Sequence, residues 1–141
     1  MKISTKGRYA LRLMLDLALH TNGSAVPLRD VAERQEISDK YLEQIVTQLA
    51  RGGLVRSIRG AGGGYLLTRT PEEYTVGEIL RQLEGSLAPV SCGAGGSCCE
   101  RSDQCVTLEI WQQIQQAVNG VVDHISLADL VRRYHEKCPN D

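Results

Sequence analysis

Four of the five cysteines of this 141-residue chain lie close together, in the segment SCGAGGSCCERSDQC. They have the spacing Cys-x5-Cys-Cys-x5-Cys, at Cys92, Cys98, Cys99 and Cys105, whereas Cys138 stands alone near the end of the chain. Thiolates are ligands of zinc and of iron–sulfur clusters, and thiol pairs can also respond to oxidation. The cluster of thiols therefore predicts a metal-binding or redox-active loop.

The spacing of these cysteines helps to distinguish a zinc site, an iron–sulfur cluster and a redox-active thiol pair. Structural zinc sites usually combine two short Cys-x2–4-Cys or His-x3–5-His pairs, and this segment has neither. Iron–sulfur clusters accept wider spacings on flexible loops, and the glycines between the cysteines would let the backbone wrap a cluster and offer N–H groups to its sulfides. We therefore favour an iron–sulfur cluster, with a redox-sensing thiol pair and a zinc site as the alternatives.

The rest of the chain argues against an oxidising compartment. No apolar run approaches the ~20 residues that a membrane span needs, and charges at Arg8, Arg12 and Asp16 interrupt the apolar residues near the N-terminus. No small-residue cleavage site follows a compact apolar stretch, so we expect no signal peptide. These features predict a cytoplasmic protein, without a membrane partner, in which thiols stay reduced.

Charge is unevenly distributed along the chain. The formal net charge is −1, but residues 1–69 carry eleven of the sixteen Lys and Arg and only six of the seventeen Asp and Glu. The first half is therefore basic, with a net charge of +5, and the remainder is acidic, with −6. This asymmetry favours a basic half that contacts an anionic partner such as nucleic acid, and chance segregation is the alternative.

Three helices are predicted in the basic half. Apolar residues recur at helical spacing over residues 5–21. A short second helix is expected over residues 28–35, after Pro27. Ser38 is suited to cap a third helix that runs to about Arg51.

The third helix has an apolar and a polar face. The apolar stripe consists of four residues at i, i+3, i+4 and i+7: Leu42, Ile45, Val46 and Leu49. At ~100° per residue, the opposite side carries Lys40, Gln44, Thr47 and Arg51. A short, partly basic face of this kind can bond to base edges and phosphates in a major groove, and an ordinary solvated surface is the alternative.

A β-hairpin with a glycine-rich tip is expected after the third helix. The segment LVRSIRGAGGGYLLT has the pattern of two strands around a turn, and Arg59 and Gly60 begin its tip. Glycines let the backbone approach a phosphate closely, and arginine can enter the negative potential of a minor groove. Three helices followed by a hairpin is the order of a winged helix-turn-helix DNA-binding domain, which we place at residues 1–70.

Residues 71–141 form the second predicted unit. Thr75 and Glu78 have the spacing of a capping box and precede a short helix over residues 76–85. The following segment, about residues 85–105, holds the four clustered cysteines and has no apolar periodicity through most of its length. Loops of this length are usually functional or disordered.

A long helix is predicted after the cysteine loop, over about residues 103–124, with Ser102 as its N-cap. Ser126 and Asp129 are suited to cap a last helix over residues 127–138. The long helix carries an apolar stripe: Ile110, Trp111, Ile114, Ala117, Val118, Val121, Val122 and Ile125. Such a stripe needs a partner surface, and dimerisation of this helix in a homodimer is the simplest solution. Packing of the helix back onto its own domain is the alternative. In either case the fold class is mainly α.

The sequence resembles a known family of bacterial winged-helix regulators, which includes IscR, NsrR and CymR. The resemblance covers the whole chain and rests above all on two stretches: Ile37-Ser38-x-x-Tyr41-Leu42-Glu43-Gln44-Ile45 and Gly53-Leu54-Val55-x-Ser57-x-Arg59-Gly60-x-x-Gly63-Gly64-Tyr65-x-Leu67. The segment from Cys99 to Thr107 looks most like the IscR-type iron–sulfur regulators of Gram-positive bacteria.

The resemblance implies a homodimeric transcription regulator, which we expect to act as a repressor on a palindromic operator in double-stranded DNA. The third helix would contact the major groove or its phosphates, and the hairpin tip would enter the minor groove. The residues that we expect to contact DNA are Ser38, Lys40, Tyr41, Gln44, Arg59 and Gly60.

The resemblance also implies a cofactor. In IscR-like members, three cysteines between the fourth helix and the dimerisation helix hold a 2Fe–2S cluster, whereas CymR-like members lack them and act with a protein partner. By position, the cluster ligands of this chain are Cys92, Cys99 and Cys105, with Cys98 as the alternative to Cys99.

The fourth ligand is left open, because two patterns of the family fail here. Leu108 stands where proteobacterial IscR has a histidine, and Arg8 lies in the region where NsrR-like members carry an acidic ligand. A ligand at Glu43 would hold the third helix directly, since Glu43 lies ~100° round that helix from the apolar stripe. Discrimination between bases is the alternative role of Glu43. The other candidates are the unused member of the Cys98–Cys99 pair, Glu109, His124 and Cys138.

We therefore expect a DNA-binding regulator that senses iron–sulfur status through a bound 2Fe–2S cluster. A regulator that senses nitric oxide or thiol redox state is the alternative within the same class. An iron–sulfur carrier or electron-transfer protein is the alternative from another class, but a carrier needs neither a wing nor a polar recognition face. We do not expect an enzyme, because no nucleophile–base pair is apparent.

Overall fold

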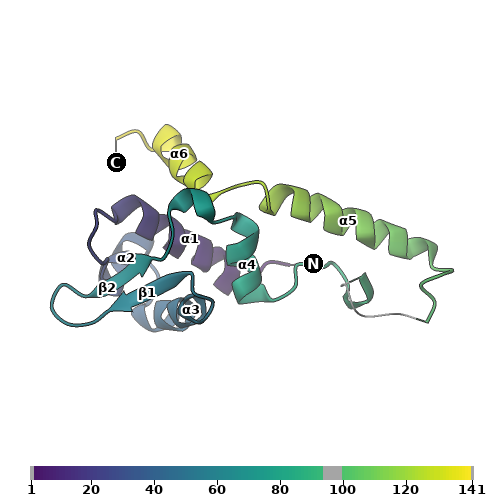
Figure 1. Ribbon diagram of the computed structural model, residues 1–141, viewed down its shortest axis with the longest axis horizontal. Coiled ribbons are helices and arrows are strands. Elements are labelled where there is room, and N and C mark those ends of the chain that lie inside the picture. The colour runs from purple at the N-terminus through teal and green to yellow at the C-terminus, as the bar shows by residue number, and fades with distance from the viewer. Residues whose placement is uncertain (1, 94–99, 141) are drawn as a thin grey trace.

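The computed structural model describes residues 2–93 and 100–140, so Cys98 and Cys99 lie outside the described residues. Figure 1 shows one rounded body, made of α1–α4, α6 and a β-hairpin, from which α5 extends. The elements in chain order are α1 (Thr5–His20), α2 (Leu28–Gln35), α3 (Asp39–Arg51), β1 (Val55–Ile58), β2 (Gly64–Leu67), η1 (Pro71–Glu73), α4 (Val76–Glu84), η2 (Ser91–Gly93), α5 (Val106–Val122) and α6 (Leu127–Lys137).

The three helices expected in the first half are confirmed, and serine caps fix the start of two of them. Ser4 caps α1, and its hydroxyl accepts a hydrogen bond from the Gly7 N–H at 3.2 Å. Ser38 caps α3 as predicted, and its hydroxyl accepts from the Tyr41 N–H, also at 3.2 Å. Each cap satisfies a backbone donor that the first turn of a helix leaves without a partner.

The predicted hairpin is an antiparallel pair in which Val55 lies opposite Leu67 and Ile58 lies opposite Gly64. Val26, in the segment before α2, forms an antiparallel bridge to β2, because its N–H and C=O bond to the backbone of Tyr65 at 2.9 and 2.8 Å. A side chain at position 64 would collide with the Val26 carbonyl, so Gly64 permits this close approach.

One apolar core lies beneath the hairpin and between the helices. The predicted stripe of α3 is completely buried in it, which confirms the apolar face of that helix. Three residues beyond the predicted domain boundary at 70/71 belong to the same core: Tyr74, Ile79 and Leu127. The core thus crosses the predicted boundary, and the division of the chain into two units stays a prediction.

Only half of the capping box predicted for α4 is present. The Thr75 hydroxyl accepts from the Glu78 N–H at 3.0 Å, as expected. The Glu78 carboxylate does not return to the cap; it binds the guanidinium of Arg69, with N–O distances of 2.6 and 3.1 Å. The charged guanidinium is a stronger partner for the carboxylate than the backbone N–H of the cap.

The long helix begins later than predicted. α5 starts at Val106, and Ser102 does not cap it, because a turn in which the Gln104 N–H donates to the Arg101 carbonyl at 3.0 Å precedes the helix. Cys105 takes the N-cap position, without a capping hydrogen bond from its side chain. The last helix, by contrast, begins as predicted, because Ser126 and Asp129 form a complete capping box.

The apolar stripe of α5 has two environments. At its C-terminal end, Val118 and Val122 pack against a second apolar cluster that includes three buried residues, Val76, Leu80 and Leu87, and Ile125, which follows the helix, packs there too. Val106, Ile110 and Val121 remain 76%, 49% and 58% exposed. The helix therefore packs onto its own domain at one end only. No helix in the described part of the chain is long and apolar enough to cross a membrane.

Candidate DNA-binding surface and cluster-binding loop

The polar face of α3 is open to solvent because the opposite face is buried in the core. Lys40 and Gln44 are exposed there, and with Glu43 and Arg51 they line a shallow groove along the helix. Lys6 of α1 borders the same groove. The groove thus combines cations that can bind phosphates with amide and carboxylate groups that can bond to base edges.

Tyr41 occupies a more sheltered place than the other residues predicted on this face. It is half-buried, and its ring meets the ring of Tyr9 edge to face, with the centroids 5.7 Å apart. The Arg12 guanidinium covers the Tyr9 ring, 5.2 Å from its centroid. This packing holds the start of α3 against α1 and fixes where the Tyr41 hydroxyl lies.

Ser38 combines capping with an available donor. Its hydroxyl oxygen accepts from the Tyr41 N–H, so the hydroxyl hydrogen remains free to donate to an acceptor such as a phosphate. The positive end of the α3 dipole lies at the same place. Ser38 can therefore bind an anion without giving up its cap.

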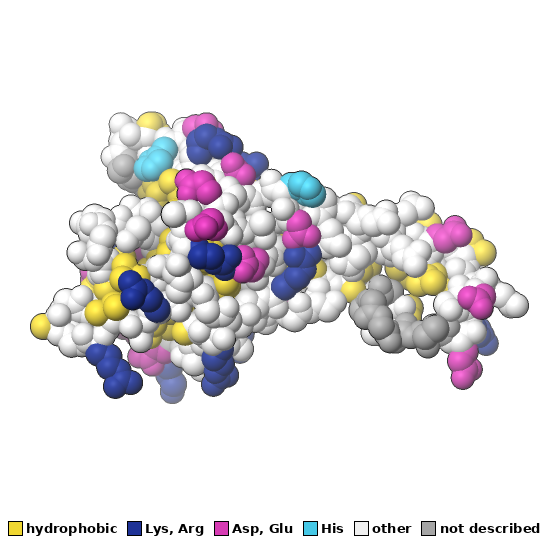
Figure 2. All heavy atoms as spheres, in the orientation of Figure 1, with side chains coloured by type: hydrophobic (Ala, Val, Ile, Leu, Met, Phe, Trp, Pro, Cys, Tyr) yellow, Lys and Arg dark blue, Asp and Glu magenta, His cyan; other side chains and the backbone are white. Residues whose placement is uncertain are grey.

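The tip of the hairpin is built by glycines and presents a cation. Gly60 and Gly62 have φ angles of +90° and +74°, which favour glycine. The Gly63 N–H closes the turn on the Gly60 carbonyl at 3.0 Å. Arg56 and Arg59 are exposed and form no ion pair with any residue among 2–93 and 100–140. Figure 2 shows Lys and Arg side chains projecting from this edge, below α3 and the hairpin.

Cys105 lies at the first turn of α5, in surroundings that favour its ionised form. Its sulfur is 3.3 Å from the Thr107 hydroxyl. The bond from this hydroxyl lowers the pKa of Cys105, with further contributions from the Leu108 and Thr107 N–H groups and from the charge of Arg101. Thiolate is the form that binds iron.

Cys92 lies at the other end of the same loop, exposed in η2, which contacts α5. The described residues contain no group of three or more potential metal ligands. The predicted ligand at Cys99, and its alternative Cys98, lie outside them. Two thiols at the ends of one loop, one of them with a lowered pKa, are donors of the type that iron–sulfur clusters bind.

The candidates for a fourth ligand lie in different parts of the fold. Glu109 borders the same surface hollow as Cys105, whereas Glu43 lies in the groove of α3. His124 stands at the far end of α5 from Cys105, about 28 Å away along the helix axis. Cys138 ends α6, on the other side of the molecule from η2 (Figure 1). Among the candidates that the structure describes, Glu109 is the one beside Cys105, and the unused member of the Cys98–Cys99 pair lies outside the described residues.

Sequence reasoning missed two residues of the candidate DNA-binding surface. Lys6 lines the α3 groove, and Tyr9 supports Tyr41. Both belong to α1, whose exposed N-terminal turn is rich in cations. That local charge was the available signal, but the packing of α1 against α3 was needed to place these residues.

Comparison with known proteins identifies the family of this chain. The family model Rrf2, described as an iron-dependent transcriptional regulator, matches residues 3–133. The HTH-type transcriptional regulator IscR of Serratia proteamaculans is 42% identical over 131 residues, which is 93% of this chain and 79% of that protein. IscR of Escherichia coli is 42% identical over 132 residues, or 93% of this chain and 80% of that protein.

Two solved structures have the same fold. The global cysteine regulator CymR of B. subtilis superposes with a TM-score of 0.78 at 41% identity, over 94% of this chain and 98% of that one. IscR of T. potens superposes with a TM-score of 0.81 at 40% identity, over 98% of this chain and 91% of that one. The expected mainly helical, winged helix-turn-helix fold is thus confirmed, and so is the resemblance seen in the sequence. The chain belongs to the Rrf2 family of iron-dependent transcriptional regulators, and it is a DNA-binding regulator rather than an enzyme.

Proposed function

We propose that this chain is a cytoplasmic, homodimeric repressor that senses iron–sulfur status through a 2Fe–2S cluster. The ligands are Cys92, Cys105 and one of the adjacent pair, with Cys99 favoured over Cys98. The observation that carries the proposal is the position of Cys105: it lies at the first turn of α5, where Thr107 stabilises a thiolate. The similarity of nearly the whole chain to proteins named IscR supports the same cofactor.

The proposed DNA contacts follow from the exposed cations and amides described above. Lys40 and Gln44 would enter the major groove from α3, and Ser38 would donate to a phosphate at the start of that helix. Arg59 would enter the minor groove from the hairpin tip. Two copies related by a two-fold axis would present two such surfaces to a palindromic operator.

The proposed signal passes through α4, which leads directly into the cysteine loop. The Gln82 amide of α4 donates to the Gln48 carbonyl of α3 at 2.9 Å. Cys92 and Cys105 would hold a bound cluster between η2 and α5, and the loop between them would then be restricted to one arrangement. Because the loop is anchored between α4 and α5, a change in the loop can shift the balance between two positions of α3.

An absorption and electron paramagnetic resonance (EPR) study of the full chain, purified without oxygen, tests the cofactor. The parent protein is expected to show the visible bands of an iron–sulfur chromophore. Cys92→Ala and Cys105→Ala are expected to abolish them, because each removes a thiolate ligand. Cys138→Ala is the matched control and should leave the bands unchanged, since Cys138 lies at the end of α6, away from the loop.

Further variants identify the remaining ligands. We expect Cys99→Ala to damage the chromophore more than Cys98→Ala does. Glu43→Ala should alter the EPR spectrum if Glu43 is the fourth ligand; if Glu43 discriminates bases, the spectrum should stay unchanged while operator preference shifts. Reconstituted protein that holds only one zinc ion per chain would contradict the cluster. Cluster-free protein whose DNA affinity changes on thiol oxidation would instead support the redox-sensing alternative.

A further inference from the structure

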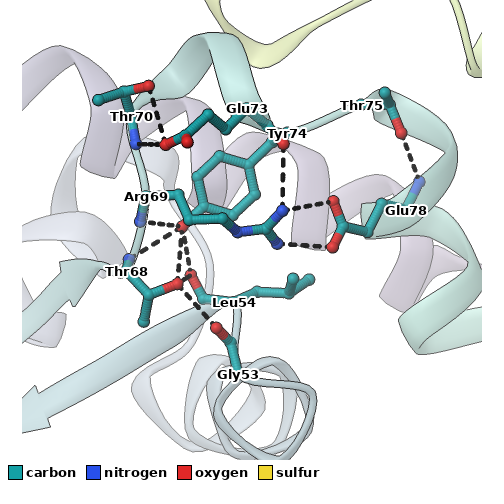
Figure 3. A network of polar contacts seen from close by, with 9 residues as sticks. All are labelled: Gly53, Leu54, Thr68, Arg69, Thr70, Glu73, Tyr74, Thr75 and Glu78. Carbon is teal, nitrogen blue, oxygen red and sulfur yellow. Dashed lines mark hydrogen bonds and ion pairs between the residues drawn. The ribbon is translucent and has the colours of Figure 1, made fainter.

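The buried phenol oxygen of Tyr74 forms hydrogen bonds to both ends of the hairpin (Figure 3). Tyr74 lies between η1 and α4 along the chain, and its side chain is completely buried. The phenol donates to the carbonyl of Leu54, at 2.7 Å, and accepts from the N–H groups of Thr68 and Arg69, at 2.9 and 3.1 Å. Leu54 immediately precedes β1, and Thr68 immediately follows β2. A phenol has one donor and two acceptor positions, which these three backbone bonds can fill, and the Thr68 hydroxyl lies 3.2 Å from the same oxygen.

Neighbouring side chains reinforce this attachment, as Figure 3 shows. The Thr68 hydroxyl donates to the carbonyl of Gly53 at 2.7 Å, directly after α3. The guanidinium of Arg69 lies over the Tyr74 ring, 4.3 Å from its centroid, and its partner there is the Glu78 carboxylate of α4. The C-terminal end of α3 and both ends of the hairpin are therefore connected through Tyr74.

The backbone of Tyr74 makes a further connection. Its carbonyl accepts from the N–H of Leu127 at 3.0 Å, and the Val76 N–H donates to the carbonyl of Ile125 at 2.9 Å. These bonds attach the segment between α5 and α6 to the strand-like residues before α4. One residue thus contacts the hairpin with its side chain and the start of α6 with its backbone.

We propose that Tyr74 is a positioning residue for the wing, defined here as residues 54–68. It sets the angle at which the wing leaves α3, and hence where Arg59 meets DNA, and it links that angle to the start of α6 through Leu127. A hairpin of two four-residue strands is only marginally stable on its own. A small rotation where the strands begin and end therefore displaces the tip. The inference rests on the proposed contact of Arg59 with DNA.

Hydrogen–deuterium exchange of the full chain without DNA gives the first test. Tyr74→Phe keeps the ring but leaves the Leu54 carbonyl and two N–H groups without their partner. Exchange at Thr68 and Arg69 is expected to become about tenfold faster or more, with α2 unchanged. The control, Leu80→Val, loosens the other apolar cluster and should leave the wing amides unchanged. Unchanged wing exchange in Tyr74→Phe, or an increase shared equally by α2, would overturn the proposal.

A double-mutant cycle with Arg59→Ala gives the second test, on the duplex most enriched by the parent protein from a random DNA library. In the parent background, Arg59→Ala should weaken binding about tenfold. In the Tyr74→Phe background it should weaken binding less than about threefold, because the two residues act together. Equal losses in both backgrounds, or the same coupling with Leu80→Val, would overturn the proposal.

The outcomes also separate this inference from the proposed function. If no duplex is enriched, the DNA contacts proposed above fail, while the exchange experiment still decides whether Tyr74 positions the wing. If Tyr74→Phe does not fold, both measurements are made on Thr68→Ala. That variant removes an exposed hydroxyl that bonds to the Gly53 carbonyl and lies 3.2 Å from the Tyr74 hydroxyl, and the same results are expected from it.

Discussion

Arg59 is presented to solvent by the backbone beneath it. The turn after Arg59 needs positive φ angles at Gly60 and Gly62, which leaves the tip narrow and without bulky neighbours. Gln44 is presented differently, by a regular helix whose opposite face is completely buried. These two residues therefore test two kinds of recognition, one of groove shape and charge and one of base identity.

Substitution of these two residues should have different effects on DNA binding. Arg59→Ala should weaken binding to every duplex and flatten its salt dependence, because a cation near phosphates is lost. Gln44→Ala should cost about 1–3 kcal/mol, mainly at the preferred sequence. Fluorescence anisotropy at several salt concentrations, on the preferred and on a scrambled duplex, measures both effects. If both variants bind the preferred duplex as the parent does, neither residue lies on the DNA surface.

At the same scale, the sequence predicts the hydrogen bonds that a side chain forms with residues close to it in the chain. Ser38 and Ser126 cap helices as expected, because each bonds to a backbone group three residues away. Glu78 had the same local signal, but its carboxylate pairs with Arg69, nine residues earlier. The Tyr74 phenol likewise reaches Leu54, twenty residues away. Such partners become visible only when the chain has folded.

Among the elements, α4 connects three other helices, α1, α3 and α5. Its Glu84 carboxylate binds Ser4 at the start of α1, and Gln82 bonds to α3. Arg81 binds both carboxylate oxygens of Asp123, at 2.5 and 3.1 Å, and the Asn119 side chain at 2.7 Å. A short helix that was predicted mainly from its cap is thus the element that orients α5 against the DNA-binding body.

The contact between Arg81 and Asp123 gives a prediction for stability and its pH dependence. The hydrogen bond from Arg81 holds the pKa of Asp123 below its ordinary value of 3.8. The stabilisation is therefore present at neutral pH and is lost as the pH falls below about 4 and Asp123 becomes protonated. Arg81→Met should lower the free energy of unfolding by about 0.5–1 kcal/mol at pH 7, a small value because both side chains are more than a third exposed.

Urea unfolding at pH 7 and pH 3, at one protein concentration, measures this effect. The difference between the parent and Arg81→Met should shrink at the lower pH. Arg132→Met is the matched control, because Arg132 also pairs with an aspartate, Asp129, but is 62% exposed. A difference that is the same at both pH values would show that Arg81 acts through packing rather than through its ion pair.

The element prediction that failed concerns the start of α5. Helical periodicity continues to the edge of the cysteine loop, and Ser102 is a good capping residue by type. The chain instead makes a turn at residues 101–104, so that the helix begins after Cys105. Capping signals are common in loops, and sequence alone does not decide which of two nearby residues begins a helix.

For the whole molecule, the arrangement of α5 has the clearest consequence. The core holds only the C-terminal end of this helix, and its first turns extend from the body with apolar residues in solvent (Figure 1). An exposed apolar stripe on a long helix is typical of an interface. The sequence predicted the stripe, but not which part of it packs on the same chain, since that division depends on where α4 lies.

In the proposed dimer, a single charge in the part of the stripe that lies outside the chain's own apolar clusters should prevent dimerisation. Ile114 is better suited than Val118, because Val118 packs on its own domain and a charge there would also disturb the fold. Ile114→Glu should raise the dimer dissociation constant by about a hundredfold or more, because an unpaired charge in an apolar interface costs about 3 kcal/mol or more. Sedimentation velocity at micromolar concentration measures the distribution between monomer and dimer.

Gln116→Glu adds the same charge to the opposite, exposed side of α5 and should leave the dimer intact, so it separates burial at the interface from a general effect of charge. The Ile114→Glu monomer should keep its helical circular dichroism, because the DNA-binding body has its own core. It should also bind a palindromic duplex much more weakly than the parent, since two linked half-sites bind more tightly than two separate ones. A parent protein that sediments as a stable monomer would contradict the dimer and, with it, the proposed palindromic operator.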